Sequence, residues 1–95
     1  MPVNVPTPEN ITLFQFNKQK NVDKVYSIDI CQNKRSQWVV SGFYGRRGYR
    51  QKTFEVETTS SYLRAKAAYD EKIQEKLKKG YTTEPPTEDP LPLTH

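Results

Sequence analysis

The residues best suited to chemistry are concentrated between positions 42 and 50, where the sequence reads Gly-Phe-Tyr-Gly-Arg-Arg-Gly-Tyr-Arg. This stretch holds three of the four glycines of the chain, together with three arginines and three aromatic residues. Glycine lets the backbone adopt positive φ angles and approach a ligand closely. Arginine supplies a forked set of donors that suits phosphate or carboxylate groups. The stretch therefore predicts a binding loop for an anionic ligand rather than a catalytic loop.

The titratable residues form no recognisable catalytic or metal-binding set. Glu55 and Glu57 lie two apart, the spacing of paired carboxylates on one strand face, but no histidine and no evident apolar pocket accompany them. The single histidine is His95 and the single cysteine is Cys31, which exclude a zinc constellation and an internal disulfide. We therefore expect no enzymatic activity, no cofactor and no metal.

Positive charge is concentrated in the middle of the chain. The whole sequence carries a net charge of +4, but residues 11–81 contain all 15 Lys and Arg against seven acidic residues, a net charge of +8. Such a balance favours a polyanionic partner, above all nucleic acid, although small basic domains are also often simply soluble. With no apolar run long enough to span a bilayer and no signal peptide, we expect a cytoplasmic protein without a membrane partner.

All seven prolines lie outside the middle of the chain and indicate its domain boundaries. With 95 residues there is room for one domain, which we place at about residues 10–82. Residues 1–9 and the acidic, proline-rich residues 83–95 are expected to be disordered tails. An alternative for the C-terminal tail is that it folds back on the basic loop and competes weakly with an anionic ligand.

The elements that must position this loop follow from the hydrophobic pattern. Strands are predicted at residues 11–16, 23–32, 37–41 and 52–57, with a tight turn at residues 33–36. A helix is predicted over about residues 61–79, with Ser60 or Ser61 as its N-cap and Gly80 ending it in the left-handed region. The predicted fold is α+β, a small antiparallel sheet with one C-terminal helix packed on one face. Its expected core consists of Tyr26, Ile28, Trp38, Val40, Phe54 and Val56 against the helix residues Tyr69, Ile73 and Leu77.

Three sequence signatures occur in order along the predicted domain. They are residues 21–26 (Asn-Val-Asp-Lys-Val-Tyr), residues 44–48 (Tyr-Gly-Arg-Arg-Gly) with Gln51, and a helical set made of Ala65, Ala68, Tyr69, Glu75, Lys76 and the triplet Lys79-Gly80-Tyr81. Together they resemble the WGR domain over about residues 11–82. This resemblance implies an antiparallel sheet with a helix on one face. WGR domains occur in DNA-dependent poly(ADP-ribose) polymerases, where they contact DNA at a break and touch neighbouring domains, and in bacterial proteins.

The triplet that names the WGR family reads Tyr44-Gly45-Arg46 in this chain. Tyr44 can stack on a sugar or base and Arg46 can form a fork to phosphate oxygens, while Gly45 leaves room for the phosphodiester. Alternatively, Tyr44 packs on Trp38 or on the helix, and Arg46 pairs with Asp29 or Glu55. The candidate nucleic-acid-binding residues are Tyr44, Gly45, Arg46, Arg47, Arg50, Lys52, Lys24, Lys18 and Lys20.

The expected partner of this loop is nucleic acid, and DNA rather than RNA. We expect binding at DNA ends or breaks, by a module that acts alone or in trans with another protein. Because Arg46 and Arg47 are adjacent, an extended segment would place only Arg46 on the face of Tyr44. The competing hypothesis is a protein-interaction domain whose loop meets an acidic protein surface. That hypothesis requires exposed anchors, for which Phe43 and Tyr49 are the candidates.

Overall fold

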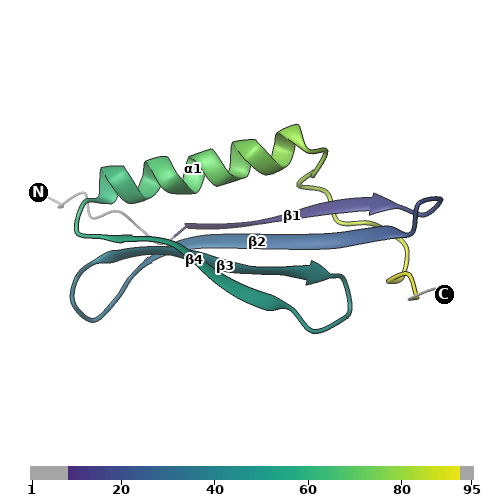
Figure 1. Ribbon diagram of the computed structural model, residues 1–95, viewed down its shortest axis with the longest axis horizontal. Coiled ribbons are helices and arrows are strands. Elements are labelled where there is room, and N and C mark those ends of the chain that lie inside the picture. The colour runs from purple at the N-terminus through teal and green to yellow at the C-terminus, as the bar shows by residue number, and fades with distance from the viewer. Residues whose placement is uncertain (1–8, 93–95) are drawn as a thin grey trace, which may run out of the picture.

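A computed structural model describes residues 9–92 as a four-stranded antiparallel sheet covered on one face by a single helix (Figure 1). The strands are β1 (Glu9–Asn17), β2 (Val22–Gln32), β3 (Trp38–Arg46) and β4 (Lys52–Thr59), and the helix is α1 (Tyr62–Lys78). The strands pair in sequence order, β1-β2-β3-β4. The predicted α+β fold is confirmed. The predicted N-terminal tail, apart from Glu9, lies outside the described residues.

Strand register decides which side chains face the helix. In β2 and β3, Tyr26 lies opposite Tyr44 and Ile30 opposite Val40. Because side chains alternate along a strand, Tyr26, Ile28 and Ile30 project to the helix-covered face. Leu13, Ile28, Ile30 and Val40 are fully buried there. The resulting core is completed by Tyr26, Trp38, Ala65 and Tyr69, with Phe54, Val56 and Ile73 partly buried against it.

The prediction that Leu77 belongs to the core is wrong. Leu77 is 38% exposed, although its spacing places it on the apolar stripe of the helix. In the last turn the sheet is met instead by its neighbour Lys76, whose ammonium lies 4.7 Å from the ring centroid of Tyr26. The long lysine side chain covers the aromatic ring and leaves Leu77 at the rim.

Both ends of α1 are formed by the residues that the sequence predicts. The hydroxyl of Ser61 accepts the backbone N–H of Arg64, which is N-capping. At the other end Gly80 has a φ of 97°. The N–H of Gly80 bonds to the carbonyl of Leu77, and the N–H of Tyr81 bonds to that of Lys76. This pattern is a Schellman motif, which needs a residue with positive φ and fixes the direction in which the chain leaves the helix.

The glycine-rich stretch is a strand for half its length, which corrects the prediction of a loop over residues 42–50. β3 continues through Arg46, and only residues 47–51 connect it to β4. Gly42 sits where a Cβ would come within 1.9 Å of the carbonyl oxygen of Ser27, so its lack of a side chain permits tight pairing with β2. The aromatic residues that follow it have a high strand propensity and extend the ladder.

The chain beyond the helix also differs from its expectation as a solvated tail. Thr82 forms an antiparallel bridge with Phe14 of β1, and residues 83–92 then pass around the end of the sheet that carries the β3–β4 connection (Figure 1). Leu91 in this segment is only 9% exposed. Proline-rich composition predicts disorder, but hydrogen bonds and an ion pair hold the segment against the domain. Within residues 9–92, the one helix is too short and too polar for a transmembrane segment.

Candidate nucleic-acid interface

A pocket of about 460 Å³ opens at the end of the sheet where α1 terminates. Its walls come from the start of β2, the end of β3 and the last turn of the helix. Three of its lining residues are cationic and two are aromatic. The complete lining consists of Asn21, Val22, Asp23, Lys24, Tyr44, Gly45, Arg46, Lys76 and Tyr81.

Strand pairing and the helix end bring these side chains together from distant parts of the chain. Lys24 of β2 is the register partner of Arg46 of β3, and Tyr44 lies two residues before Arg46 on the same strand face. The Schellman motif places Tyr81 directly after the helix, and Lys76 lies one turn earlier. The pocket therefore exists only when sheet and helix are assembled.

Lys76 is held in the pocket by aromatic rings. Its Nζ atom lies 4.7 Å from the ring centroid of Tyr26 and 5.7 Å from that of Tyr81, distances of cation–π contacts. Burial lowers the pKa of Lys76, and the nearby charge of Lys79 lowers it further. Burial also raises the pKa of Tyr26 to about 12, so this ring stays neutral. A partly desolvated ammonium of this kind gains when an anion binds beside it.

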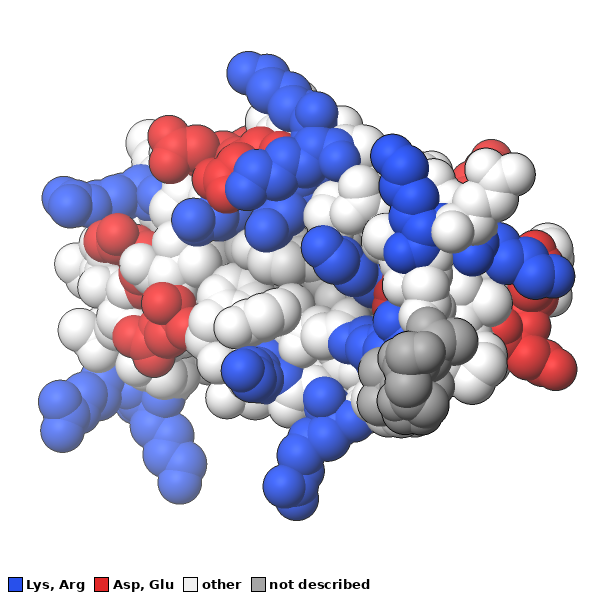
Figure 2. Space-filling model, turned by 45° about the vertical axis from the view of Figure 1, so that its right-hand side comes forward, with Lys and Arg blue, Asp and Glu red and all other residues white. Residues whose placement is uncertain are grey.

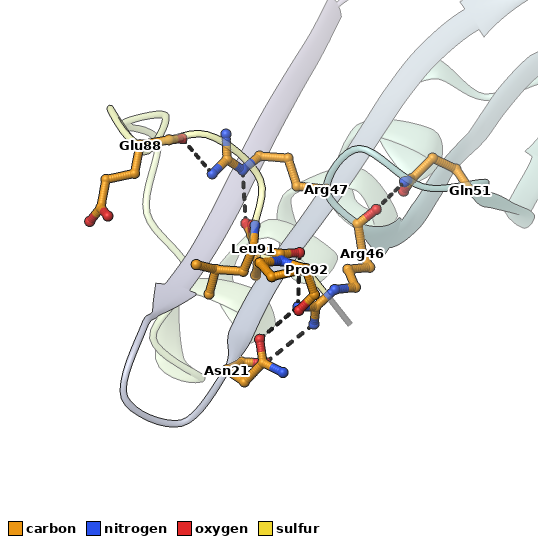
Figure 3. Close-up of polar contacts among 8 residues, drawn as sticks. Asn21, Arg46, Arg47, Gln51, Glu88, Leu91 and Pro92 are labelled. Atoms are coloured by element: carbon orange, nitrogen blue, oxygen red, sulfur yellow. Dashed lines mark hydrogen bonds and ion pairs between the residues drawn. The ribbon is translucent and has the colours of Figure 1, made fainter. Parts of the chain in front are cut away.

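Arg46 is bonded to neutral acceptors, and neither of the expected carboxylates contacts it. Its Nη2 atom donates to the Oδ1 of Asn21 at 2.7 Å and to the carbonyl oxygens of Leu91 and Pro92 at 3.1 and 3.0 Å (Figure 3). Its Nη1 atom donates to the carbonyl of Asn21 at 3.2 Å. Asp29 instead accepts a hydrogen bond from the hydroxyl of Ser41, and Glu55 accepts one from the hydroxyl of Thr58. Within residues 9–92 the charge of Arg46 is therefore not neutralised by an ion pair.

Arg47 follows β3 directly and is not among the residues that line the pocket. Its Nε atom donates to the Oδ1 of Asp23 at 2.8 Å, and its Nη2 atom donates to the carbonyl of Glu88 at 2.8 Å (Figure 3). The guanidinium carbon lies 5.8 Å from the ring centroid of Phe16. The side chain of Asp23 is completely buried, while that of Arg47 is 18% exposed. The ion pair gives Arg47 a structural role at this end of the sheet.

Tyr44 is partly packed and partly free. Its ring lies 6.0 Å from that of Phe54, centroid to centroid, and the residue remains 43% exposed. The expected alternative, packing on Trp38, does not occur, since Trp38 meets Tyr62 edge to face at 5.0 Å. Tyr44 thus presents an aromatic surface at the rim of the pocket.

The turn after β3 is held by Gln51. Its Nε2 atom donates to the carbonyl oxygens of Arg46 and Tyr49, both at 2.7 Å. Its Oε1 atom lies where a Cβ on Gly45 would approach to 2.8 Å, so glycine at this position leaves room for the amide. Gln51 therefore fixes the backbone that carries Arg46.

The remaining predicted residues lie around the pocket rather than in it. Lys52 is the register partner of Tyr44 on β4, Arg50 is exposed in the β3–β4 turn, and Lys20 is exposed in the β1–β2 turn. Lys18 forms an ion pair with Glu88 at 3.3 Å. Figure 2 shows blue Lys and Arg side chains bordering an uncharged area on several sides of this face, with red acidic side chains mainly toward its margins.

The predicted binding residues did not include five residues of the pocket lining, Asn21, Val22, Asp23, Lys76 and Tyr81. Lys76 lies in the last turn of the helix, where the helix dipole favours cations, so its position has a structural explanation that requires no ligand. The available signal was the spacing of Lys76 to the Gly80-Tyr81 pair, because a Schellman motif brings the residue after the glycine back over the last turn. The positive φ of Asn21, 54°, could not be recognised from the residue type alone.

These features define a small basic α+β domain with an aromatic and cationic pocket at one end. Residues 9–88 match the family model of the WGR domain, and the chain belongs to this family. WGR domains are nucleic-acid-binding modules and not catalytic domains. Comparisons with curated proteins and with solved structures gave no match.

Proposed function

We propose that this domain binds DNA through its phosphate backbone, with one phosphate seated in the pocket among Lys24, Arg46 and Lys76. The observation that carries the proposal is that all three cations face one cavity and none forms an ion pair within the described part of the chain. Clustered cations without carboxylate partners repel one another, and an anion between them removes that cost. Tyr44 at the rim offers an exposed aromatic face to a sugar or base, and Tyr81 lines the same pocket.

The exposed cations around the pocket extend the site along the DNA strand. Lys20, Arg50 and Lys52 are candidates for contacts with neighbouring phosphates. Within residues 9–92, no helix carries a set of polar side chains suited to reading base edges in a groove, so binding should tolerate any sequence. DNA is preferred over RNA in this proposal, and an equal affinity for RNA of the same sequence would contradict that preference.

The test is a titration of fluorescently labelled single-stranded DNA, blunt duplex, nicked duplex and duplex RNA at several salt concentrations. With about four phosphate contacts, the slope of log K against log salt should be about −3.6 for duplex DNA, since each contact contributes about −0.9. The triple variant Lys24→Ala, Arg46→Ala, Lys76→Ala should lose most of the affinity. Its control is Lys34→Ala, Arg35→Ala, Lys78→Ala, which removes the same charge from exposed positions outside the pocket.

One observation favours a second candidate function. Phe43 and Tyr49 are 40% and 43% exposed, and such aromatic residues are the anchors that a protein interface requires. Arg46 also lies 5.8 Å from the ring centroid of Tyr49, so the two can contact a partner together. A salt-independent affinity for DNA, combined with DNA binding that resists the triple substitution, would favour this protein-interaction function.

A further inference from the structure

The segment 83–92, hereafter the C-terminal strap, occupies donors of the proposed phosphate site. Its residues Leu91 and Pro92 supply two of the three acceptors around the Nη2 atom of Arg46. A guanidinium Nη2 carries only two hydrogens, so these contacts leave none for a phosphate oxygen. Nucleic acid can therefore reach that end of Arg46 only if the strap carbonyls leave.

The strap is chemically matched to the surface that it covers. It contains Glu84, Glu88 and Asp89 and no Lys or Arg, whereas the domain beneath it is strongly basic. Glu88 pairs with Lys18, and its carbonyl oxygen accepts from Arg47. The strap thus offers carbonyl oxygens to Arg46 and Arg47 and a carboxylate to Lys18, the kinds of acceptor that an anionic ligand presents.

Two contacts hold the strap in position on the domain. The buried Oδ2 atom of Asp23 accepts the backbone N–H of Leu91 at 2.8 Å. A Cβ on Gly48 would come within 2.9 Å of the Cβ of Pro90, so the turn leaves a space that the proline ring fills. Prolines also restrict the free segment, which lowers the entropy lost when it docks.

We propose that the C-terminal strap is an intramolecular competitor of the nucleic acid, docked on Arg46 in the free protein and displaced from it when phosphate binds. This inference rests on the proposed function, because it concerns the regulation of the same site. The Thr82–Phe14 bridge stays in place, and residues 88–92 move. Only molecules with a displaced strap bind DNA, so the apparent affinity equals the intrinsic affinity multiplied by the fraction of molecules in which the strap is undocked.

The test uses full-length protein with two kinds of release variant. Leu91→Ala removes the buried side chain without changing the charge. Glu88→Lys breaks the pair with Lys18 and repels it. Glu84→Lys is the matched control, with the same charge change at an exposed strap residue that forms no ion pair within residues 9–92. We expect both release variants to bind blunt duplex DNA about tenfold more tightly than their references, wild type and Glu84→Lys. Circular dichroism confirms that each variant is folded.

A second measurement follows the strap in the wild-type protein. The amide of Leu91, bonded to buried Asp23, should exchange its hydrogen faster when duplex DNA is added, while that of Thr82 should not. DNA binding by wild type without a gain in either release variant, or unchanged exchange at Leu91, would overturn the competitor and identify the strap as a support for the arginines. Loss of the proposed function has a different signature, because neither wild type nor release variants would then bind DNA.

Discussion

Arg47 and Asp23 form an ion pair in which the side chain of Asp23 is completely buried and that of Arg47 is 18% exposed. The backbone N–H of Arg47 also donates to the carbonyl of Asp23 at 2.9 Å, so the two residues are joined at both main chain and side chain. The pair ties the start of the β3–β4 turn to β2 and provides the anchor for Leu91. It organises one wall of the pocket, because Asp23 belongs to the pocket lining.

Removal of this carboxylate should destabilise the fold strongly. Asp23→Ala leaves Arg47 without its partner and the Leu91 amide without its acceptor, and breaking a buried pair costs about 3–5 kcal/mol in the free energy of unfolding. Urea denaturation measures this. The control Glu57→Gln disrupts the exposed pair with Arg64, which should cost less than about 1 kcal/mol. Equal effects of the two substitutions would contradict the structural role of Asp23.

Substitution of Arg46 should mainly lower the affinity for DNA, whereas substitution of Arg47 should mainly lower the stability of the fold. Arg46→Ala should weaken DNA binding by about 1.5–3 kcal/mol, the range for a charged hydrogen bond, because Arg46 lines the pocket. Arg47→Ala should weaken binding less and lower the melting temperature more, because it exposes buried Asp23. Affinity titration and thermal melting of both variants check this. Equal losses of affinity would indicate a diffuse positive patch instead of a defined site.

Restoring the family residue at position 44 should strengthen binding. Tyr44→Trp enlarges an aromatic ring that is 43% exposed at the pocket rim, so the larger ring has space and offers more surface for stacking. We expect tighter DNA binding with little change in melting temperature. A lower melting temperature without a gain in affinity would mean that the ring is overpacked against Phe54.

The affinity for DNA should depend on the protonation of Lys76. Burial, together with Lys79, Lys72 and Lys24, lowers the pKa of its ammonium, whereas Glu75 opposes the shift. Since only the charged form attracts phosphate, affinity should begin to fall, as pH rises, at a lower pH than an ordinary lysine would cause. Burial raises the pKa of Tyr26 to about 12 and also raises that of Tyr81, so both hydroxyls lose their protons at higher pH than an ordinary tyrosine. Lys76→Arg should keep the affinity and remove this alkaline decline, which titration across alkaline pH would reveal.

Acid should loosen the contact between β1 and the helix. Hydrogen bonds from Lys66 at 2.8 Å and from the Tyr62 hydroxyl at 2.7 Å lower the pKa of Glu9 from its ordinary 4.5. A lowered pKa means that this stabilisation is complete above the ordinary value and is lost as pH falls through the lowered one. Glu9→Gln should therefore reduce the melting temperature at neutral pH and flatten its decline in acid. A decline as steep as that of wild type would exclude Glu9 as a contributor.

The parts of the fold that the sequence predicted are those specified locally. Ser61, Gly80 and the spacing of Tyr62, Ala65 and Tyr69 define the helix because capping and periodicity act within a few residues. The extension of β3 through the glycines was not predictable in this way, since it depends on pairing with Ser27 and its neighbours on β2.

The pocket and the strap depend on contacts between distant residues. Lys76 becomes a pocket residue only when Tyr26 of β2 lies beneath it. Leu91 docks because the buried carboxylate of Asp23 has a second oxygen, Oδ2, that accepts its backbone N–H. The composition of the strap predicts disorder, and nothing local in its sequence identifies the acceptor on the other side of the domain.

The three cations of the pocket reside on β2, β3 and α1, so a phosphate held by all of them fastens helix to sheet. On the proposed function, a ligand that binds only this assembled state adds RT ln(1 + [L]/Kd) to its stability, about 2.7 kcal/mol at a hundredfold excess over Kd. In a domain of this size such a gain changes the time spent unfolded by about two orders of magnitude. Ligand-bound molecules should therefore resist proteases that digest ligand-free molecules. The lifetime of the protein would then report the concentration of ligand around it.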